Sequence, residues 1–400
     1  MHQLNTKYIL RVIREQSPIS RSEIVEKTDL TAATVSRIVN KLIKFKLVTE
    51  TGYAESKGGR KAVLLELIAE SVLTIGIDIE IDEIAAVVID LDGNTLLDKQ
   101  TVLKGKIDKE YILTKVKEII TFLLSDQSYS KKIIGIGIGM HGLVDSENGV
   151  SIFPPAFGWT DFPLASIISE EYALPVSLEN NVRALTLAEK WFGLAKNLNN
   201  FICLKLGTGI GSGIYINDNI YRGSSNSAGE IGHTMVDENG PLCTCGNYGC
   251  LESMASIPAI IKRTAKALKQ GAASEINSLI DNKIEELNLQ IIIQAAKQGD
   301  HLSRQILQEV GHYLGISISS LVNILNPEAV IISGELVRAG DFFMASLKST
   351  LENRALTYPA KHFRIINSNL GKNGVAIGAA TLILESVFNI DKQLSVDIGL

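Results

Sequence analysis

The sequence predicts an α/β protein in which an N-terminal winged helix-turn-helix precedes a larger domain of two α/β lobes. Three observations carry this prediction. Short helical patterns and a basic loop fill residues 1–70, apolar strands alternate with helices over residues 71–400, and residues 228–252 concentrate cysteine, histidine and carboxylate side chains. We therefore expect a DNA-binding domain over the first of these ranges and a second domain, with a metal-bound loop at 233–252, over the rest.

Composition indicates a globular chain in a reducing compartment. Hydrophobic residues make up 46% of the 400 residues, which is enough to bury more than one core. No run of about eighteen uncharged apolar residues occurs, so we expect no membrane span. The N-terminus lacks the apolar core and cleavage site of a signal peptide, and the few cysteines cluster at metal spacing. These features predict a cytoplasmic protein.

Charge is distributed unevenly along the chain. Residues 1–61 carry twelve Lys or Arg against six Asp or Glu, a net charge of +6, whereas the whole chain has a net charge of -5. The remainder therefore carries -11. A polyanion such as DNA is attracted to the first segment and repelled by the rest, so only the N-terminal module suits nucleic acid.

Three helical patterns precede residue 48. The first covers residues 6–15, and the second covers residues 20–28, with Ser20 as N-cap and Glu23 completing a capping box. The third runs over residues 31–45 and has an apolar stripe at helical spacing, which leaves its other face polar. Its place after a short turn is typical of the recognition helix of a helix-turn-helix. This polar face presents Thr34, Ser36, Arg37, Asn40, Lys41 and Lys44.

A wing is predicted after the third helix. Residues 48–68 read as two strands joined by a basic loop with paired glycines, which allow the backbone to approach a duplex closely. Arg and Lys at the tip of such a loop contact phosphates or enter the minor groove. A three-helix bundle that uses its basic face for protein contacts is the alternative. We assign base contacts to Thr34, Ser36, Arg37 and Asn40, and mainly backbone contacts to Lys41, Lys57, Gly59, Arg60 and Lys61.

A metal site is predicted within AGEIGHTMVDENGPLCTCGNYGCLE, residues 228–252. Three of the four cysteines fall within eight residues, and a histidine precedes them at a distance that a tight loop closes. Three thiolates and one imidazole fill the tetrahedral shell of Zn²⁺ and leave no position for water, which indicates a structural metal. A disulfide with a spare thiol is the alternative, although Cys-x-Cys spacing strains such a bridge. The predicted ligands are His233, Cys243, Cys245 and Cys250.

The second domain begins with a strand meander and continues with alternating strands and helices. Two apolar runs and a turn at Asp92-Gly93-Asn94 predict the meander, and a helix follows over residues 108–125. The same succession recurs in the second half, which predicts two lobes with a cleft between them. Further strands are expected at 132–140, 201–206, 210–217 and 329–333, and a last helix at 373–389.

These motifs resemble those of the ROK family, which unites sugar-responsive repressors and sugar kinases. The resemblance rests on EIGHTMV followed by CTCGNYGCLE and extends over essentially the whole chain, and the winged helix-turn-helix points to the repressor branch. It implies an actin-like, hexokinase-like ATPase fold of the ROK type for residues 72–400. It also implies a structural zinc ion and oligomerisation through this domain.

Two departures from the kinases of this family predict that the chain is not an enzyme. Their first hairpin carries an Asp-x-Gly-Gly-Thr phosphate loop, whereas residues 78–82 here supply three carboxylates and no glycine, so no ATP is expected. Asn181 stands where those kinases have the catalytic aspartate, and an amide cannot accept a proton as a base. The glycines of residues 207–213 resemble a second phosphate loop, but they also mark a tight turn between strands.

The resemblance further implies a sugar site. Amides and carboxylates pair with vicinal hydroxyls, and His233 is shared because one ring nitrogen binds zinc while the other faces the ligand. Capping is the alternative role for the two glutamates, and a turn role for Asn180. Trp159, in an FGW loop beside the site, is better explained as a core or lid residue. The implied sugar contacts are Gly142, Asn180, Asn181, Glu230, His233 and Glu252.

Together these features predict a sugar-responsive transcriptional repressor of a carbohydrate utilisation operon, released from DNA when sugar closes the two lobes. We expect a homodimer or homotetramer on double-stranded, palindromic operator DNA. Action of the sugar as co-repressor is equally compatible with the sequence. Control by a protein partner and an active ATP-dependent sugar kinase are the alternative functions. The pocket residues do not distinguish one sugar from another.

Overall fold

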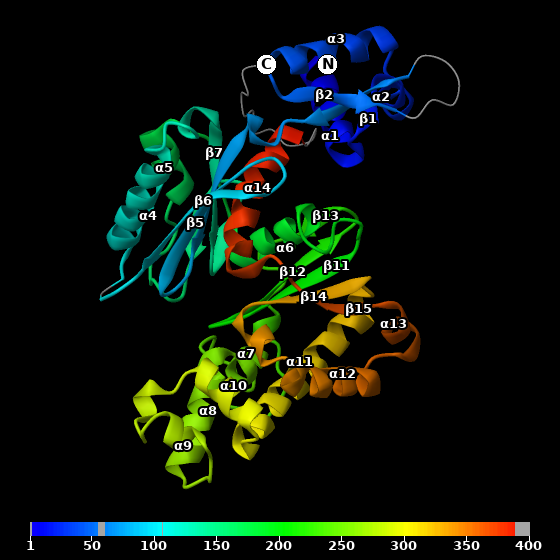
Figure 1. The fold of residues 1–400 in the computed structure, drawn as a ribbon. Coiled ribbons are helices and arrows are strands. Elements are labelled where there is room, and N and C mark those ends of the chain that lie inside the picture. The colour runs from blue at the N-terminus through cyan, green and yellow to red at the C-terminus, as the bar shows by residue number, and fades with distance from the viewer. Residues whose placement is uncertain (1, 55–60, 106, 389–400) are drawn as a thin grey trace. The chain divides into compact units, whose positions relative to one another are not determined.

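The computed structural model describes residues 2–54, 61–105 and 107–388. The chain divides into two units, Met1–Ala188 together with Asn373–Leu400, and Glu189–Lys372 (Figure 1). It passes from one unit to the other twice. The first passage lies within helix α6 (Asn181–Trp191) and the second just before helix α14 (Gly374–Phe388).

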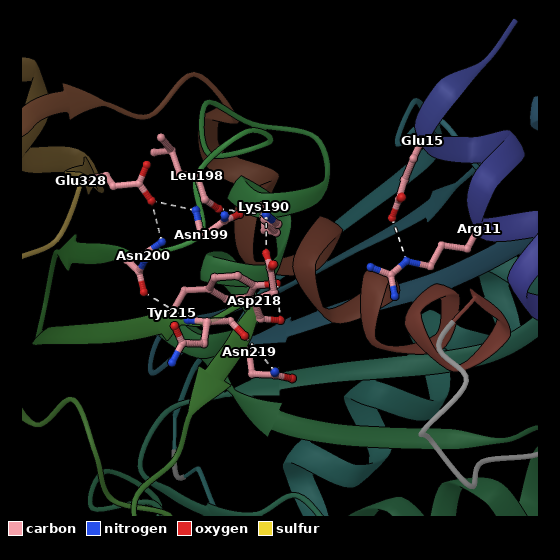
Figure 2. Close-up of polar contacts among 11 residues, drawn as sticks. Arg11, Glu15, Lys190, Leu198, Asn199, Asn200, Tyr215, Asp218, Asn219 and Glu328 are labelled. Carbon is pink, nitrogen blue, oxygen red and sulfur yellow. Dashed lines mark hydrogen bonds and ion pairs between the residues drawn. The ribbon is translucent and has the colours of Figure 1, made fainter. Parts of the chain in front are cut away.

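The first unit begins with the predicted winged helix-turn-helix. All three predicted helices and both wing strands are present, and a short strand, β1, was not predicted. The three strands form one sheet in the order β1-β3-β2. An ion pair of 2.8 Å joins Arg11 and Glu15 one turn apart on the first helix (Figure 2). The elements are α1 (His2–Gln16), β1 (Ile19–Ser20), α2 (Arg21–Thr28), α3 (Ala32–Lys44), β2 (Val48–Tyr53) and β3 (Val63–Leu67).

Local side chains start the second and third helices, as predicted. The Ser20 hydroxyl accepts the backbone N–H of Glu23, and the Glu23 carboxylate accepts the backbone N–H of Ser20, which completes the capping box of α2. Thr31 caps α3 by accepting the backbone N–H of Thr34 at 3.2 Å. The apolar stripe of α3 is buried, and its opposite face is directed outward. The buried residues of α3 are Val35, Ile38, Val39 and Leu42.

A five-stranded sheet follows in the first unit, in the order β10-β7-β4-β5-β6. Strands β4, β5 and β6 form the predicted antiparallel meander, and β7 and β10 continue the sheet in parallel with β4. Two helices, α4 and α5, and a small hairpin, β8–β9, complete this part. The bounds are β4 (Leu73–Ile79), β5 (Glu83–Ile89), β6 (Thr95–Val102), α4 (Lys109–Leu124), β7 (Ile133–Met140), β8 (Leu143–Asp145), β9 (Val150–Phe153), α5 (Leu164–Tyr172) and β10 (Val176–Asn180).

Helices cover both faces of this sheet, with α4 on one side and α14 on the other (Figure 1). Ile75 and its alternate neighbours on β4 pack in the same apolar core as α4. The opposite face carries glycines where α14 lies. A methyl group at Gly76 would overlap the carbonyl oxygen of Ala376, and one at Gly137 would overlap that of Ala379. Glycine therefore lets the backbone of α14 lie directly on the strands.

Helix α14 also contacts the DNA-binding module. The ammonium group of Lys7 on α1 donates a hydrogen bond of 2.9 Å to the carbonyl oxygen of Ser386. The guanidinium of Arg14 lies 5.5 Å from the ring centroid of Phe388. One helix therefore supports the sheet of the first unit and contacts the DNA-binding module at its other end.

The second unit repeats the topology of the first sheet. Its strands follow the order β13-β12-β11-β14-β15, with an antiparallel meander and two further strands parallel to β11. The predicted recurrence in two halves is confirmed, and the β4–β5 and β11–β12 turns occupy equivalent positions in the two sheets. The strands are β11 (Phe201–Leu206), β12 (Ile210–Ile216), β13 (Asn219–Tyr221), β14 (Ala329–Ser333) and β15 (Arg364–Asn367).

Helices fill the rest of the second unit and form its main apolar core with the sheet. Helices α11 and α12 pack closely where glycine permits it. A methyl group at Gly311 would overlap the carbonyl oxygen of Phe343. Among the described residues, none of the helices combines the length and apolar character that a membrane span requires. The helices are α7 (Leu251–Ala255), α8 (Ile257–Lys269), α9 (Ile276–Leu279), α10 (Leu289–Gln298), α11 (His301–Leu325), α12 (Asp341–Arg354) and α13 (Thr357–His362).

A polar network fastens the loop after α6 to the sheet of the second unit (Figure 2). The Glu328 carboxylate accepts the backbone N–H groups of Asn199 and Asn200, each at 2.8 Å. Lys190, near the end of α6, donates a hydrogen bond of 3.0 Å to the carboxylate of Asp218. Within the second unit, these bonds hold the end of α6 and the loop that follows it to Glu328 and Asp218.

Candidate functional site

The four predicted metal ligands come together in the second unit. The Nδ1 atom of His233 lies 3.6 Å from Sγ of Cys243, and the Sγ atoms of Cys245 and Cys250 lie 3.7 Å apart. All four ligand atoms lie within 4.8 Å of one another. Around a tetrahedral Zn²⁺ with Zn–S bonds of about 2.3 Å and a Zn–N bond of about 2.1 Å, the Nδ1–Sγ separation is about 3.6 Å and the Sγ–Sγ separation is about 3.8 Å. The donor set therefore fits the ion, and none of the four cysteines forms a disulfide.

Tight turns place these ligands. The backbone N–H of Cys243 donates to the carbonyl of Asn247 at 2.7 Å, and both Gly246 and Gly249 have positive φ. A side chain at Gly249 would overlap the carbonyl of Asp237, so the chain closes only with glycine there. His233 ends a 3₁₀ turn, and Cys250 is the residue before α7.

The thiols differ in their acidity. The backbone N–H of Asn247 lowers the pKa of the Cys245 thiol to about 7, whereas burial raises the pKa of the Cys250 thiol to about 12. Three sulfurs at these distances repel one another as thiolates. A cation among them removes that repulsion, which agrees with the fit of the ligand atoms to Zn²⁺.

Three of the predicted sugar contacts also lie in the second unit. Glu230 is exposed, and its carbonyl oxygen accepts the backbone N–H of His233. Because Nδ1 of His233 faces Cys243, its Nε2 is the ring nitrogen left for another partner. Glu252 on α7 is half-buried, and its Oε2 accepts the backbone N–H of Ile210 at 3.0 Å. Glu252 therefore stabilises the β11–β12 turn, a role close to the capping alternative, through one of its two oxygens.

The glycine-rich stretch forms that turn. The backbone N–H of Gly207 donates to the carbonyl of Gly209 at 3.0 Å. Two N–H groups of this phosphate-loop-like segment, those of Gly207 and Ile210, thus have protein acceptors. Each of these hydrogen bonds within the protein has to break before its N–H group can donate to a phosphate.

The other three predicted sugar contacts lie in the first unit, around the start of α6. Asn180 accepts the N–H groups of Val182 and Arg183 at 2.9 and 3.3 Å through Oδ1, and so caps this helix. Its Nδ2 donates to the carbonyl of Gly142 at 3.1 Å. The amide of Asn180 thereby performs the local role left open by the sequence, and one of its N–H bonds is left for a ligand.

Asn181 is buried and has an unforeseen partner. Its Nδ2 donates a hydrogen bond of 2.9 Å to Oε1 of Glu80, at the β4–β5 turn. At both positions the sequence differs from the kinases of the family that it resembles, and the two residues lie 101 positions apart in the chain. No pattern in the sequence signals this contact, because only the folded sheet brings the turn to the start of α6.

A buried ion pair lies beneath the same helix start. Arg183 and Glu179 are 3.4 Å apart, and both side chains are at most 2% exposed. Oε1 of Glu179 also accepts the hydroxyl of Ser146 and the backbone N–H of Asn180, each within 2.9 Å. These bonds compensate the burial of the carboxylate, and one of them holds the backbone of Asn180 at the start of α6. The i,i+4 spacing of Glu179 and Arg183 is visible in the sequence, but their burial is not.

The FGW loop packs into the core of the first unit. Trp159 is 7% exposed, and its indole N–H donates to the hydroxyl of Ser151 at 3.0 Å. Phe157 stacks on Trp159 with ring centroids 4.9 Å apart and meets the His141 ring edge-on. This geometry agrees with a core role for Trp159 and with a packing role for His141.

The predicted DNA-binding face of α3 is directed outward. Arg37 and Asn40 are exposed, and Thr34 shares a hydroxyl hydrogen bond of 2.9 Å with Thr31. Arg21, at the start of α2, was not predicted, yet its guanidinium donates to Oδ1 of Asn40 at 3.2 Å. That bond uses the carbonyl oxygen of the Asn40 side chain and leaves its two N–H donors for other partners. Ser36 and Lys41 are half-buried and Lys61 is exposed, whereas Lys57, Gly59 and Arg60 lie outside the described residues.

Comparison with known proteins decides the family. The model described as ROK family matches residues 74–386, and one described as winged helix-turn-helix DNA-binding matches residues 5–44. The chain belongs to the ROK family. The predicted family is confirmed, and so is the fold, a winged helix-turn-helix followed by a two-lobed actin-like domain.

Two relatives are similar over nearly the full chain. The xylose repressor of Caldicellulosiruptor bescii is 34% identical over 97% of each chain. The transcriptional dual regulator NagC of Escherichia coli is 29% identical over 97% of this chain and 94% of its own. Similarity at both ends of the molecule means that the DNA-binding module and the ROK domain are matched together.

Two solved structures share the fold. A ROK family transcriptional regulator described as a homolog of E. coli MLC has a TM-score of 0.84 and 28% identity, covering 97% of this chain and 96% of its own. A ROK family glucokinase from Streptomyces griseus, in complex with glucose and AMPPNP, has a TM-score of 0.70 and 27% identity. It covers 98% of its own chain but 78% of this one.

Proposed function

We propose that this chain is a sugar-responsive, DNA-binding transcriptional repressor. The observation that carries the proposal is the union of an outward-facing recognition helix with a ROK domain in one chain. A xylose repressor and the regulator NagC share that union over nearly their full length. The proposed target is a carbohydrate utilisation operon.

Xylose is the first sugar to test, because the xylose repressor of C. bescii is 34% identical along 97% of this chain. N-acetylglucosamine is the second, because relatives named N-acetylglucosamine repressor are 29% identical. We propose that amide, carboxylate and imidazole side chains, together with the backbone at Gly142, bind the sugar hydroxyls. Amides and carboxylates suit this task because each offers paired donors or acceptors to vicinal hydroxyls. The proposed contacts are Gly142, Asn180, Asn181, Glu230, His233 and Glu252.

A continuous series of contacts in the first unit supports coupling between sugar and DNA. Asn181 begins α6, and one turn later the carbonyl of Ala184 lies so close to Gly378 on α14 that a methyl group there would overlap it. Helix α14 in turn contacts Lys7 of the DNA-binding module through Ser386. A shift of α6 on sugar binding therefore has a packed route to α1. A coupling of about 1–3 kcal/mol changes DNA affinity about 5- to 150-fold.

We propose further that the chain carries out no phosphoryl transfer. Asn181 cannot accept a proton from a sugar hydroxyl, and its amide is hydrogen-bonded to Glu80. The β4–β5 turn has carboxylates where a phosphate loop needs glycines, and the Gly207 and Ile210 amides of the β11–β12 turn have protein acceptors. Relatives with the same domain arrangement are repressors, which supports this proposal.

The metal is proposed to be a structural Zn²⁺ held by the four ligands described above. When bound, the ion fixes the turns between His233 and Cys250 and thereby the loop that carries Glu230 and Glu252 at its two ends. His233 links the two roles, since Nδ1 faces the thiols and Nε2 is left for a sugar.

On DNA, Arg37 and Asn40 are proposed to contact base edges, while basic side chains of the wing contact the backbone. A homodimer or homotetramer that places two modules on a palindromic operator agrees with two-fold symmetry in such regulators. The chain thus has two partners, double-stranded DNA and a small sugar.

Two DNA-binding variants test this proposal. Arg37→Ala should lower affinity for a duplex selected from a random-sequence pool by about 10-fold or more and leave random DNA almost unaffected. Arg60→Ala should weaken binding to both duplexes and reduce the slope of log affinity against log salt by about one. Anisotropy titrations at several salt concentrations measure both effects. Equal losses on selected and random DNA from both variants would contradict the assignment, and a sugar panel that leaves thermal stability unchanged would favour control by a protein partner.

A further inference from the structure

Glu80 contacts Asn181, the predicted sugar-binding residue that stands where the kinases of the family have a catalytic base. Glu80 lies on the β4–β5 turn, where its backbone N–H donates to the carbonyl of Glu83 at 2.9 Å and holds the turn closed. Its Oε1 accepts the amide Nδ2 of Asn181 at 2.9 Å. Asn181 is 6% exposed, so its amide is confined to the partners around it.

The chemistry of the pair determines which way the amide points. An ionised carboxylate only accepts hydrogen bonds, whereas an asparagine amide has a donor end and an acceptor end. Glu80 therefore requires the Nδ2 end of Asn181. The Oδ1 end of the amide is then the atom left for a ligand, so Asn181 offers an acceptor to whatever group it meets.

We propose that Glu80 is a positioning residue that makes this site select a free sugar hydroxyl over a phosphate ester. The inference rests on the proposed function, in which Asn181 contacts the sugar. A hydroxyl donates to Oδ1 of Asn181, but a phosphate monoester near neutral pH carries about -1.5 to -2 charges and offers mainly acceptor oxygens. Two acceptors facing each other form no hydrogen bond, and a site built for a hydroxyl strongly rejects a group that cannot donate.

The two departures from a kinase thus have one joint consequence. Replacing the catalytic base by an amide removes the reaction, and the carboxylate at position 80 gives that amide a fixed polarity. The ligand class that follows is an unphosphorylated sugar whose hydroxyl at Asn181 donates a proton in a hydrogen bond.

Matched pairs of ligands test the proposal on the full chain. The probes are D-xylose, D-glucose and N-acetylglucosamine, each compared with its terminal phosphate ester by isothermal titration calorimetry. In the wild type, the parent sugar that binds best should bind about 100-fold or more tightly than its ester. In Glu80→Gln, whose amide pairs with either end of Asn181, that ratio should fall about 10-fold or more.

Two further variants separate positioning from folding and from charge. Asp82→Asn removes one charge from the same turn and should leave the sugar-to-ester affinity ratio within about 2-fold of wild type. The fall of about 10-fold expected for Glu80→Gln corresponds to about 1.4 kcal/mol. The double variant Glu80→Gln with Asn181→Asp exchanges the amide and the carboxylate. It again presents only an acceptor to the ligand, so it should restore the ratio that Glu80→Gln loses. Thermal unfolding midpoints show whether each variant is folded, and a structural loss alone lowers affinity for both members of a pair together.

Each outcome has a distinct meaning. A wild type that binds an ester as tightly as its parent sugar overturns the inference and leaves the proposed function standing. An Asp82→Asn variant that loses the ratio as strongly as Glu80→Gln overturns it too, because charge alone then explains selection. A chain that binds no probe at all contradicts the proposed function itself.

Discussion

The two hairpin turns at equivalent positions in the two sheets differ in where their hydrogen-bonded carboxylate comes from. The β4–β5 turn carries its own carboxylates, and Glu80 binds the side chain of Asn181. The β11–β12 turn is rich in glycine, and a carboxylate from another element, Glu252 on α7, accepts its Ile210 N–H. In both turns a carboxylate is hydrogen-bonded where a kinase would bind phosphate. Glycine content alone therefore does not predict phosphate binding. Backbone N–H groups bind a phosphate only when protein acceptors do not already occupy them.

Removing the metal should disturb the second turn and spare the first. Cys245→Ser deletes one ligand, and Glu252 follows Cys250 by only two residues, so the support of Ile210 depends on the metal-bound loop. We expect loss of zinc and a fall of about 3 kcal/mol or more in the free energy of unfolding, since structural zinc contributes about 10–16 kcal/mol of binding free energy in small zinc domains. Metal analysis and urea unfolding measure both effects.

Hydrogen exchange localises that effect. The amide of Ile210 should exchange faster in Cys245→Ser, whereas the amide of Glu80, in the other sheet, should keep its wild-type rate. Thr244→Ala changes an exposed neighbour between two ligands and should retain the metal. Equal acceleration at both turns would show that the metal stabilises the whole chain and not the second turn alone.

A smaller and pH-dependent effect is expected at the first turn. Asn181→Asp places a second carboxylate against Glu80, and two carboxylates this close raise the pKa of one of them above its unfolded value of about 4. A raised folded-state pKa means that stability is full below the unfolded pKa and is lost as pH rises from the unfolded value through the raised folded value. The variant should therefore match wild type near pH 4 and lose about 1–2 kcal/mol by pH 7–8.

The matched control for this change is Asn181→Ala. It removes the amide without adding a charge, so its loss of stability should be the same at pH 5 and pH 8. Urea unfolding across this pH range measures both variants. A flat pH profile for Asn181→Asp would mean that Glu80 and position 181 do not interact in the folded chain.

Features encoded by near neighbours were predicted from the sequence. The capping box of Ser20 and Glu23, the Thr31 cap and the His233 cysteine cluster all depend on residues close in the chain, so spacing alone reveals them. The strands β4–β7, β11, β12 and β14 and the helices α4 and α14 followed from apolar periodicity, and the repeat in two halves followed from the order of strands and helices. These features confirm that local signals are strong wherever the partners lie within one loop or one turn of helix.

Features that depend on distant parts of the chain were not predicted. Glu80 and Asn181 meet only after the sheet has formed, and Arg21 reaches Asn40 only after two helices have packed. Asn180 illustrates a subtler limit, because its type suits a sugar contact and a helix cap equally. Its bonds to Val182 and Gly142 are visible only in the folded chain.

One measurement tests most directly the claim that this chain senses sugar without modifying it. The full chain is titrated onto a selected operator duplex with a panel sugar, with and without ATP and Mg²⁺, and the sugar is then analysed for phosphorylation. We predict that one sugar changes DNA affinity about 5- to 150-fold, that ATP leaves this change unaltered, and that the sugar is recovered unphosphorylated. ATP-dependent formation of a sugar phosphate, or a response to sugar that requires ATP, would contradict the account.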